Sequence, residues 1–177
     1  EEINARVFLM LGFPGESYEM IFDTIDLSKQ MGLDWYNVTI LQPLPNTPIF
    51  DAMLEQGYLD IANIDFGDIR YNSGAYGKHR KKAEADNDLL ASDFKDAFKG
   101  KDMNTIPTRS ELDHIWAYMN YHLNFGPLFS EKRPLKQLQK LQYVTNISDV
   151  IAPENAIAMY FQGYLQFKVN GVVEPTL

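Results

Sequence analysis

Cysteine is absent from this sequence of 177 residues. Its absence excludes disulfide bonds, thiolate zinc sites, cysteine nucleophiles and iron–sulfur clusters held by the chain's own thiolates. The three histidines, His79, His114 and His122, lie too far apart for a local metal motif, so we expect no metal ligands in the chain. No run approaches the roughly 20 consecutive apolar residues that span a bilayer, so we do not expect a membrane partner. The lack of cysteine fits a cytoplasmic location.

Basic side chains are scarce in the first third of the chain. Residues 1–68 contain 12 acidic and 2 basic side chains, within a chain of net charge −8. Such a surface repels a phosphate backbone, so we do not expect nucleic acid as a partner. The dense basic run at residues 78–82 has no interleaved aromatic side chains, and we interpret it as a solvated loop. The hydrophobic content of 45 % is nevertheless enough for a sizeable core.

Residues 5–41 carry the pattern of a βαβ unit. The apolar run at 5–11 stops at Gly12-Phe13-Pro14-Gly15, which predicts a strand buried on both faces, as in parallel sheets. Ser17 can cap a following helix and Gly32 can end it. Residues 35–41 are rich in aromatic and β-branched side chains, which predicts a second strand. Because a crossover helix joins parallel strands, the first third is expected to be α/β.

Helical patterns dominate the remainder. A short helix is predicted from the cap Thr47 through Pro48 to Gly57. Residues 57–107 are irregular, with a polar helix predicted at about 84–98. Three further helices are predicted from a capping box, Thr108 with Glu111, that leads to a stop at Gly126-Pro127; from the stripe Leu135, Leu138 and Leu141; and from Pro153 onward, with Ile157, Tyr160, Phe161, Tyr164 and Leu165 on one face.

These stripes are expected to form core, and the chain is expected to divide into three parts. Residues 1–66 would be the end of a barrel, 67–107 an irregular linker, and 108–177 a helical region. The predicted fold class is therefore α/β to α+β, with a partial (βα) barrel unit at the N-terminus followed by a mainly helical C-terminal region.

The first strand and its turn carry a resemblance to a known family. Phe8-Leu9-Met10-Leu11-Gly12-Phe13-Pro14-Gly15-Glu16 resembles the fifth strand of the radical S-adenosylmethionine (SAM) barrel and the turn after it. It is similar to a variant of that family's G-x-I-x-G-x-x-E motif, with Met10 at the isoleucine, Gly12 at the second glycine and Glu16 at the acid. Phe8 stands where the first glycine would be, and the turn is one residue longer.

A second block follows at the distance expected for the same family. Residues 35–51, which include Gln42-Pro43-Leu44-Pro45-Asn46-Thr47-Pro48, resemble its sixth strand and P-x-P-G-T-P segment. Asn46 replaces the usual glycine, and asparagine tolerates left-handed backbone geometry better than most residues. Together the two blocks cover about the first 60 residues, in the branch of iron–sulfur oxidoreductase-like enzymes near the methylthiotransferases and cobalamin-associated members.

The resemblance implies a role in a SAM site. In the family, three cysteines of a C-x3-C-x2-C loop hold a 4Fe–4S cluster, which binds SAM and cleaves it reductively to a 5′-deoxyadenosyl radical. Cobalamin is a further cofactor of some members. The cofactor-binding residues that the resemblance implies in this chain lie at the carboxyl ends of the two strands and are Met10, Gly12, Gly15, Glu16, Gln42, Pro43 and Leu44.

The cluster loop and the first four strands have no counterpart in this sequence. We therefore expect a C-terminal fragment of a radical SAM enzyme, inactive alone, whose partner is the missing N-terminal half of its barrel. Two strands leave unpaired edges, so a homodimer of the fragment is a further expectation unless the helical part covers those edges.

Other interpretations remain open from the residues alone. The same glycines and acid also fit an ordinary βα turn followed by a capped helix. The main alternative function is a non-catalytic module whose helical part binds a protein partner, with the βαβ unit as scaffold. A hydrolase or transferase with paired carboxylates is a third interpretation, but no acidic pair in the first third has distinctive spacing.

Overall fold

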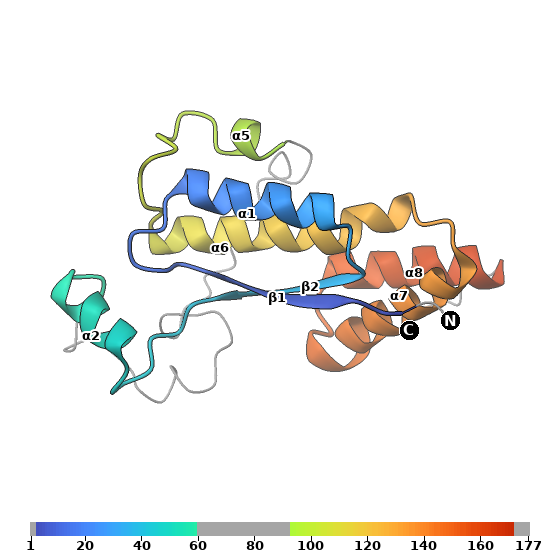
Figure 1. The fold of residues 1–177 in the computed structure, drawn as a ribbon. Coiled ribbons are helices and arrows are strands. Elements are labelled where there is room, and N and C mark those ends of the chain that lie inside the picture. Colours follow the sequence, from blue (N-terminus) through green and yellow to red (C-terminus); the bar gives the residue numbers. More distant parts are fainter. Residues whose placement is uncertain (1–2, 60–92, 172–177) are drawn as a thin grey trace.

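The computed structural model describes residues 3–59 and 93–171 of the chain (Figure 1). It confirms a mixed fold in which a parallel strand pair precedes a mainly helical region. The elements are β1 (Arg6–Leu11), α1 (Tyr18–Met31), β2 (Trp35–Ile40), α2 (Pro48–Glu55), α5 (Phe94–Ala97), α6 (Arg109–Asn120), the π-helical turn η2 (Tyr121–Phe125), the 3₁₀ turn η3 (Gly126–Phe129), α7 (Pro134–Asn146), the π-helical turn η4 (Ile147–Ile151) and α8 (Ala156–Asn170).

The βαβ unit forms as the sequence predicts. β1 and β2 pair in parallel from Arg6 opposite Trp35 to the ends of both strands, and α1 makes the crossover. The side-chain oxygen of Ser17 accepts a hydrogen bond from the first turn of α1. Gly32 ends the helix with φ 58°, a left-handed conformation that glycine adopts without a steric penalty. The predicted cap and stop of this helix are therefore both confirmed.

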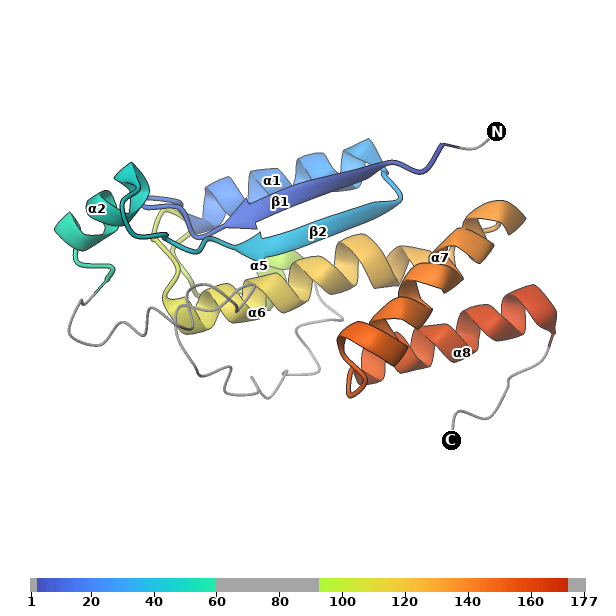
Figure 2. The ribbon, with the colours of Figure 1, turned by 90° about the horizontal axis from the view of Figure 1, so that it is seen from below.

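Among the described residues, helices cover one face of the sheet along its whole length. α1 and α6 pack on it (Figures 1 and 2) and form the first core with the inward side chains of both strands. On the opposite face Phe8 is 80 % exposed and Met10 is 46 % exposed. The prediction that β1 is buried on both faces was therefore wrong, because among the described residues helices cover that second face only near Trp35, the first residue of β2.

Side chains of the helical region close the outer edge of β2. The Asn124 amide accepts from the Tyr36 backbone N–H and donates to the Tyr36 carbonyl, both at 2.8 Å. Trp116 donates its indole N–H to the Val38 carbonyl at 2.7 Å. Backbone groups that a neighbouring strand would otherwise satisfy are thus bonded to α6 and η2. From the sequence, we expect the strand edges to be covered either by the helical part or by a second copy of the chain. At the outer edge of β2, the helical part provides the cover.

α6 begins at the predicted capping box, but the helical segment does not stop where expected. Thr108 and Glu111 exchange side-chain and backbone hydrogen bonds at the start of α6. The chain then passes through η2 and η3 and stays helical across Gly126-Pro127 to Phe129. Proline is accommodated because it lies in the first turn of η3, where its missing N–H costs nothing.

α7 and α8 pack on each other around a second core, but the predicted buried face of α7 was wrong for two of its three leucines. Leu135 is 58 % exposed and Leu138 is 44 % exposed, whereas Lys136, Lys140 and Val144 are buried. The buried face includes a lysine because Lys136 forms an ion pair with the strand region. Of the predicted stripe, Leu141 packs against the second core as expected, whereas Leu135 and Leu138 are left on the outer side of the helix.

The last helix and the central segment also differ from prediction. α8 begins at Ala156 and not at Pro153, because Asn155 supplies the N-cap. Tyr160, expected in the core with Phe161, is exposed. In the predicted helix 84–98, residues 84–92 lie outside the described residues, as does the basic run 78–82 with His79. The described part is the single turn α5, and its Phe94 and the following Phe98 join the first core.

Candidate functional site

The two sequence blocks meet at the edge of the sheet that is formed by the carboxyl ends of the two strands, called here the carboxyl edge. β1 and β2 are parallel, so the segments that follow them start side by side, near α2 in Figure 2. The Leu41 N–H donates to the Leu11 carbonyl at 2.7 Å, which joins the end of one strand to the end of the other. This edge is where parallel α/β proteins place their ligands.

Glu16 closes the turn that follows β1. Its Oε2 accepts from the backbone N–H of Gly12 at 2.5 Å and of Phe13 at 3.2 Å. Burial raises the pKa of Glu16, and these two hydrogen bonds oppose the rise. Gly12 and Gly15 have φ 84° and 82°, which a residue with a side chain rarely adopts. The Glu16 carboxylate therefore stabilises the turn by hydrogen bonds to the turn's own backbone.

The segment after β2 contains the left-handed residue that its sequence suggested. Asn46 has φ 65° and is the only non-glycine residue with positive φ among those the structure describes. Thr47 then caps α2, accepting from the Phe50 N–H at 3.3 Å and donating to the Leu44 carbonyl at 2.7 Å. Gly57, just beyond the helix, has φ 75°. The asparagine occupies the conformation that a glycine would have at this position.

Two of the predicted residues offer groups suited to a flat ligand. Met10 is half-exposed on the open face of the sheet. Gln42, just beyond β2, has a buried side-chain nitrogen with no hydrogen-bond partner among the described residues. Buried donors are normally satisfied, so an unpaired one needs an explanation. Of its neighbours in sequence, Pro43 is buried and Leu44 is exposed.

A cavity of about 380 Å³ lies beside the turn after β1. Gly12 and Glu16 are the predicted residues that line it. Its wall is otherwise mainly apolar, and the remaining lining residues are Phe13, Pro14, Met53, Tyr58, Ile106, Pro107, Thr108 and Leu112. The other predicted residues do not line it, namely Met10, Gly15, Gln42, Pro43 and Leu44. The structure therefore brings the predicted residues to one edge but into more than one environment.

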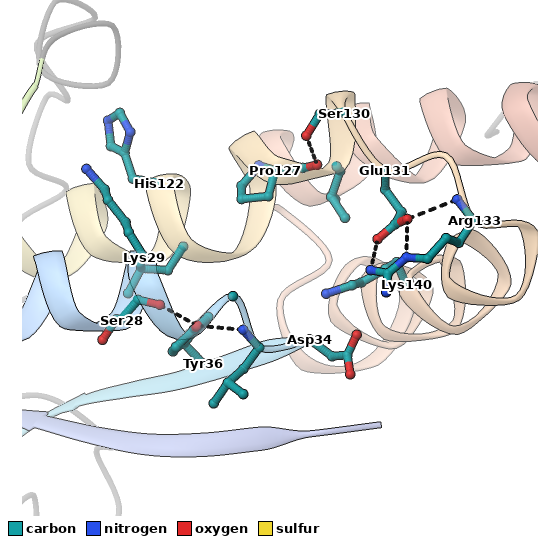
Figure 3. A pocket seen from close by; sticks show the side chains of 14 residues that line it. Ser28, Lys29, Asp34, Tyr36, His122, Pro127, Ser130, Glu131, Arg133 and Lys140 are labelled. Atoms are coloured by element: carbon teal, nitrogen blue, oxygen red, sulfur yellow. Dashed lines mark hydrogen bonds and ion pairs between the residues drawn. The ribbon is translucent and has the colours of Figure 1, made fainter. Parts of the chain in front are cut away.

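A second cavity, also about 380 Å³, lies at the opposite end of the strands (Figure 3). It is lined by the end of α1, the start of β2, the η2–η3 segment and α7. Its lining is far more polar than that of the first cavity, with charged or ionisable side chains from Lys29, Asp34, His122, Glu131, Arg133 and Lys140.

The two acids of this polar cavity are both paired. Asp34 accepts from Lys136 Nζ at 2.8 Å and from the Ala5 N–H at 2.8 Å. Glu131 accepts from both ends of the Arg133 guanidinium, at 2.9 and 2.7 Å, and these bonds, opposed by burial, lower the pKa of Glu131 to about 2. Both carboxylates are therefore ionised and neutralised near neutral pH.

Sequence reasoning missed this cavity. Its residues come from two distant segments, 28–36 and 122–140, and form no local motif. The one available signal was the spacing of Lys136, Lys140 and Val144, which places two lysines on the same helix face as a valine. Lysine on a helix ordinarily faces solvent, so the sequence alone does not predict that this face is buried.

No family model, curated protein or solved structure matched the chain. The resemblance to radical SAM enzymes therefore stays a prediction. No helix in the described part of the chain is long and apolar enough to cross a membrane.

Within residues 3–59 and 93–171, no three His, Asp or Glu side chains come together as metal ligands. The groups available at the predicted edge are an apolar surface, a buried amide donor and a tightly closed turn. These groups can bind and orient a ligand. Glu16 already accepts two hydrogen bonds from its own turn, so the described geometry gives it a structural role and no proton-transfer partner.

Proposed function

We propose that the chain is the C-terminal part of a radical SAM iron–sulfur enzyme and contributes the adenine side of its SAM site. The observation that carries the proposal is the meeting of the two motif turns at the carboxyl end of a parallel strand pair whose second face exposes Phe8 and Met10. In a (βα) barrel, helices cover the outer face and the inner face lines the site. Phe8 and Met10 lie on the face that would be inner.

The state of the two sheet edges supports the same arrangement. Asn124 and Trp116 close the outer edge of β2, whereas no described side chain bonds to the outer edge of β1. The resemblance makes β1 and β2 the fifth and sixth strands, so strands one to four would add beyond β1. The edge of β1 that no described side chain closes is thus the edge at which the fourth strand would pair.

The residues at the carboxyl edge of the strand pair fit part of a SAM molecule. Adenine has a flat apolar face and a polar rim, which correspond to the exposed Met10 side chain and the unpaired Gln42 amide nitrogen. Gly12 and Glu16 would keep the turn in the shape that lets backbone approach the ligand. In the complete enzyme, one electron from the cluster would cleave bound SAM into methionine and a 5′-deoxyadenosyl radical. The chain has no cysteine to hold the cluster, so we propose that it is inactive without its N-terminal half.

Complementation provides the test. The upstream coding region should contain a C-x3-C-x2-C loop, and co-expression of that half with this chain should restore 5′-deoxyadenosine formation from SAM. Gln42→Ala and Met10→Ala should each weaken SAM binding by roughly tenfold, the effect of about 1.4 kcal/mol. The matched controls Gln142→Ala and Met20→Ala, both exposed on helices, should not change it. An upstream region without the cysteine loop would overturn the proposal.

The second candidate function is a protein-interaction module. The exposed Leu135 and Leu138 on α7 favour it, because neighbouring apolar side chains on an outer helix face suit a partner helix. Under this proposal Leu135→Glu with Leu138→Glu would abolish binding of a stable partner without unfolding the chain. Partner binding unaffected by the double substitution would exclude this face as the interface.

A further inference from the structure

The polar cavity contains one buried cation that the protein does not neutralise by contact. Lys140 is 7 % exposed, lines the cavity, and makes no hydrogen bond or ion pair with any described residue. Its Nζ lies over the Trp35 ring, 6.0 Å from the ring centroid. Figure 3 shows the Lys140 side chain reaching into the cavity from α7.

The carboxylates near Lys140 are already engaged. Asp34 is bonded to Lys136, and Glu131 is bonded through both oxygens to Arg133. Lys29, on α1, adds a second cation to the cavity lining and makes no ion pair with a described residue. With both acids paired, the cavity has a surplus of positive charge, although the whole chain carries a net charge of −8.

Lys140 is buried as a residue and its ammonium faces the cavity, and a cation that is largely desolvated without a bonded partner is energetically costly. Burial lowers the pKa of Lys140, and the charges of Asp34 and Glu131 oppose that shift. A negatively charged group placed in the cavity would complete the missing hydrogen bonds and offset the cost of desolvation. The volume of about 380 Å³ is in the range of small-molecule sites.

We propose that this cavity binds a small organic anion, carrying a carboxylate or a phosphate group, with Lys140 as its principal counterion. The site lies at the opposite end of the strands from the two motif turns and uses none of their residues. It is therefore independent of the proposed SAM site.

Isothermal titration calorimetry on the full chain tests the proposal, with sodium phosphate and sodium succinate as probes and sodium chloride holding the ionic strength constant. We expect saturable binding of at least one probe. Lys140→Met should weaken it by at least about tenfold, the value of one charge-assisted hydrogen bond. Lys132→Met, an exposed lysine near the start of the same helix, should leave it unchanged.

The outcomes separate the possible ligands. Binding of phosphate alone assigns a phosphate-bearing ligand, and binding of succinate alone assigns a carboxylate. Absence of saturable binding of both probes would overturn the proposal, and so would an equal loss in the two lysine variants, which indicates surface screening. If Lys140→Met does not fold, as judged by circular dichroism, Lys140→Gln and Lys140→Arg decide. Binding must then be lost in the glutamine variant and kept in the arginine variant.

Discussion

The ion pair between Asp34 and Lys136 ties the strand region to α7 and gives a sharp test of how the fold is held together. The two residues are 102 positions apart, and their side chains are almost fully buried. Lys136 Nζ lies 2.8 Å from Asp34 Oδ2 and also donates to the Ile3 carbonyl at 2.7 Å. Asp34 further accepts from the Ala5 N–H. Removing either partner leaves a buried charge without its contact.

The expected magnitude follows from that burial. Breaking a buried pair by removing one partner costs about 3–5 kcal/mol, whereas replacing both charges is often close to neutral. We therefore expect Lys136→Met to lower the free energy of unfolding by about 3 kcal/mol. The double variant Asp34→Asn with Lys136→Met should recover about 2 kcal/mol of that loss, because the asparagine oxygen can still accept from Ala5.

Urea unfolding followed by circular dichroism measures these free energies in wild type, both single variants and the double variant. Lys132→Met serves as the matched control, since that lysine is exposed and should change stability by less than about 0.5 kcal/mol. A loss below about 1 kcal/mol in Lys136→Met would refute the reasoning. So would additive losses in the double variant, because they would mean that the two charges do not interact.

The same pair predicts a direction for the acid sensitivity of the fold. Burial alone would raise the pKa of Asp34, but the hydrogen bonds from Lys136 and Ala5 outweigh it and hold the pKa below its usual 3.8. A carboxyl with a lower pKa in the folded state stabilises the fold above its unfolded pKa, and this contribution is lost as pH falls through the folded pKa. Asp34→Asn should therefore reduce the drop in unfolding free energy between about pH 6 and about pH 3.

The closed edge of β2, the left-handed asparagine and the two faces of α7 each give a further expectation, measurable by urea unfolding. Asn124→Ala leaves the N–H and C=O of Tyr36 unpaired and should cost about 2–4 kcal/mol; a cost below about 1 kcal/mol would contradict the edge role. Asn46→Ala should cost about 1 kcal/mol because of its positive φ, whereas Asn46→Gly should be tolerated; equal effects would refute this cause. Val144→Ala should cost about 1–3 kcal/mol, and Leu138→Ala less than about 0.5. Similar losses for these two would mean that the leucine is covered.

Local signals predicted the beginnings of three helices. Ser17, Thr47 and Thr108 all cap the helices that follow them, because a capping hydrogen bond joins residues only a few positions apart. The parallel pairing of the two strands was likewise predictable, since a crossover helix of this length leaves few alternatives. The turn residue Asn46 was identified for the same reason: its conformation depends on its own side chain.

What the sequence did not reveal depends on distant partners. Leu135 and Lys136 are adjacent on α7. The leucine was expected to be buried and the lysine to be exposed, but the reverse holds because Asp34, far away in sequence, forms an ion pair with the lysine. Phe8 was expected in a fully covered strand, and its exposure depends on which elements reach the second face of the sheet. The burial of Lys140 was not predicted because lysine side chains are mostly exposed to solvent. Periodicity reports that a helix has two faces and not which one is inside.

Asn124 also limits how many copies of this chain can associate through their strands. A two-stranded sheet with both edges open can add copies at each side and grow into a filament. Here the side-chain amide occupies one edge in the way a neighbouring peptide group would. Within the described part of the chain, the outer edge of β1 is the strand edge to which no side chain bonds. We therefore expect any strand-to-strand association of this chain to use that edge and to end at a pair.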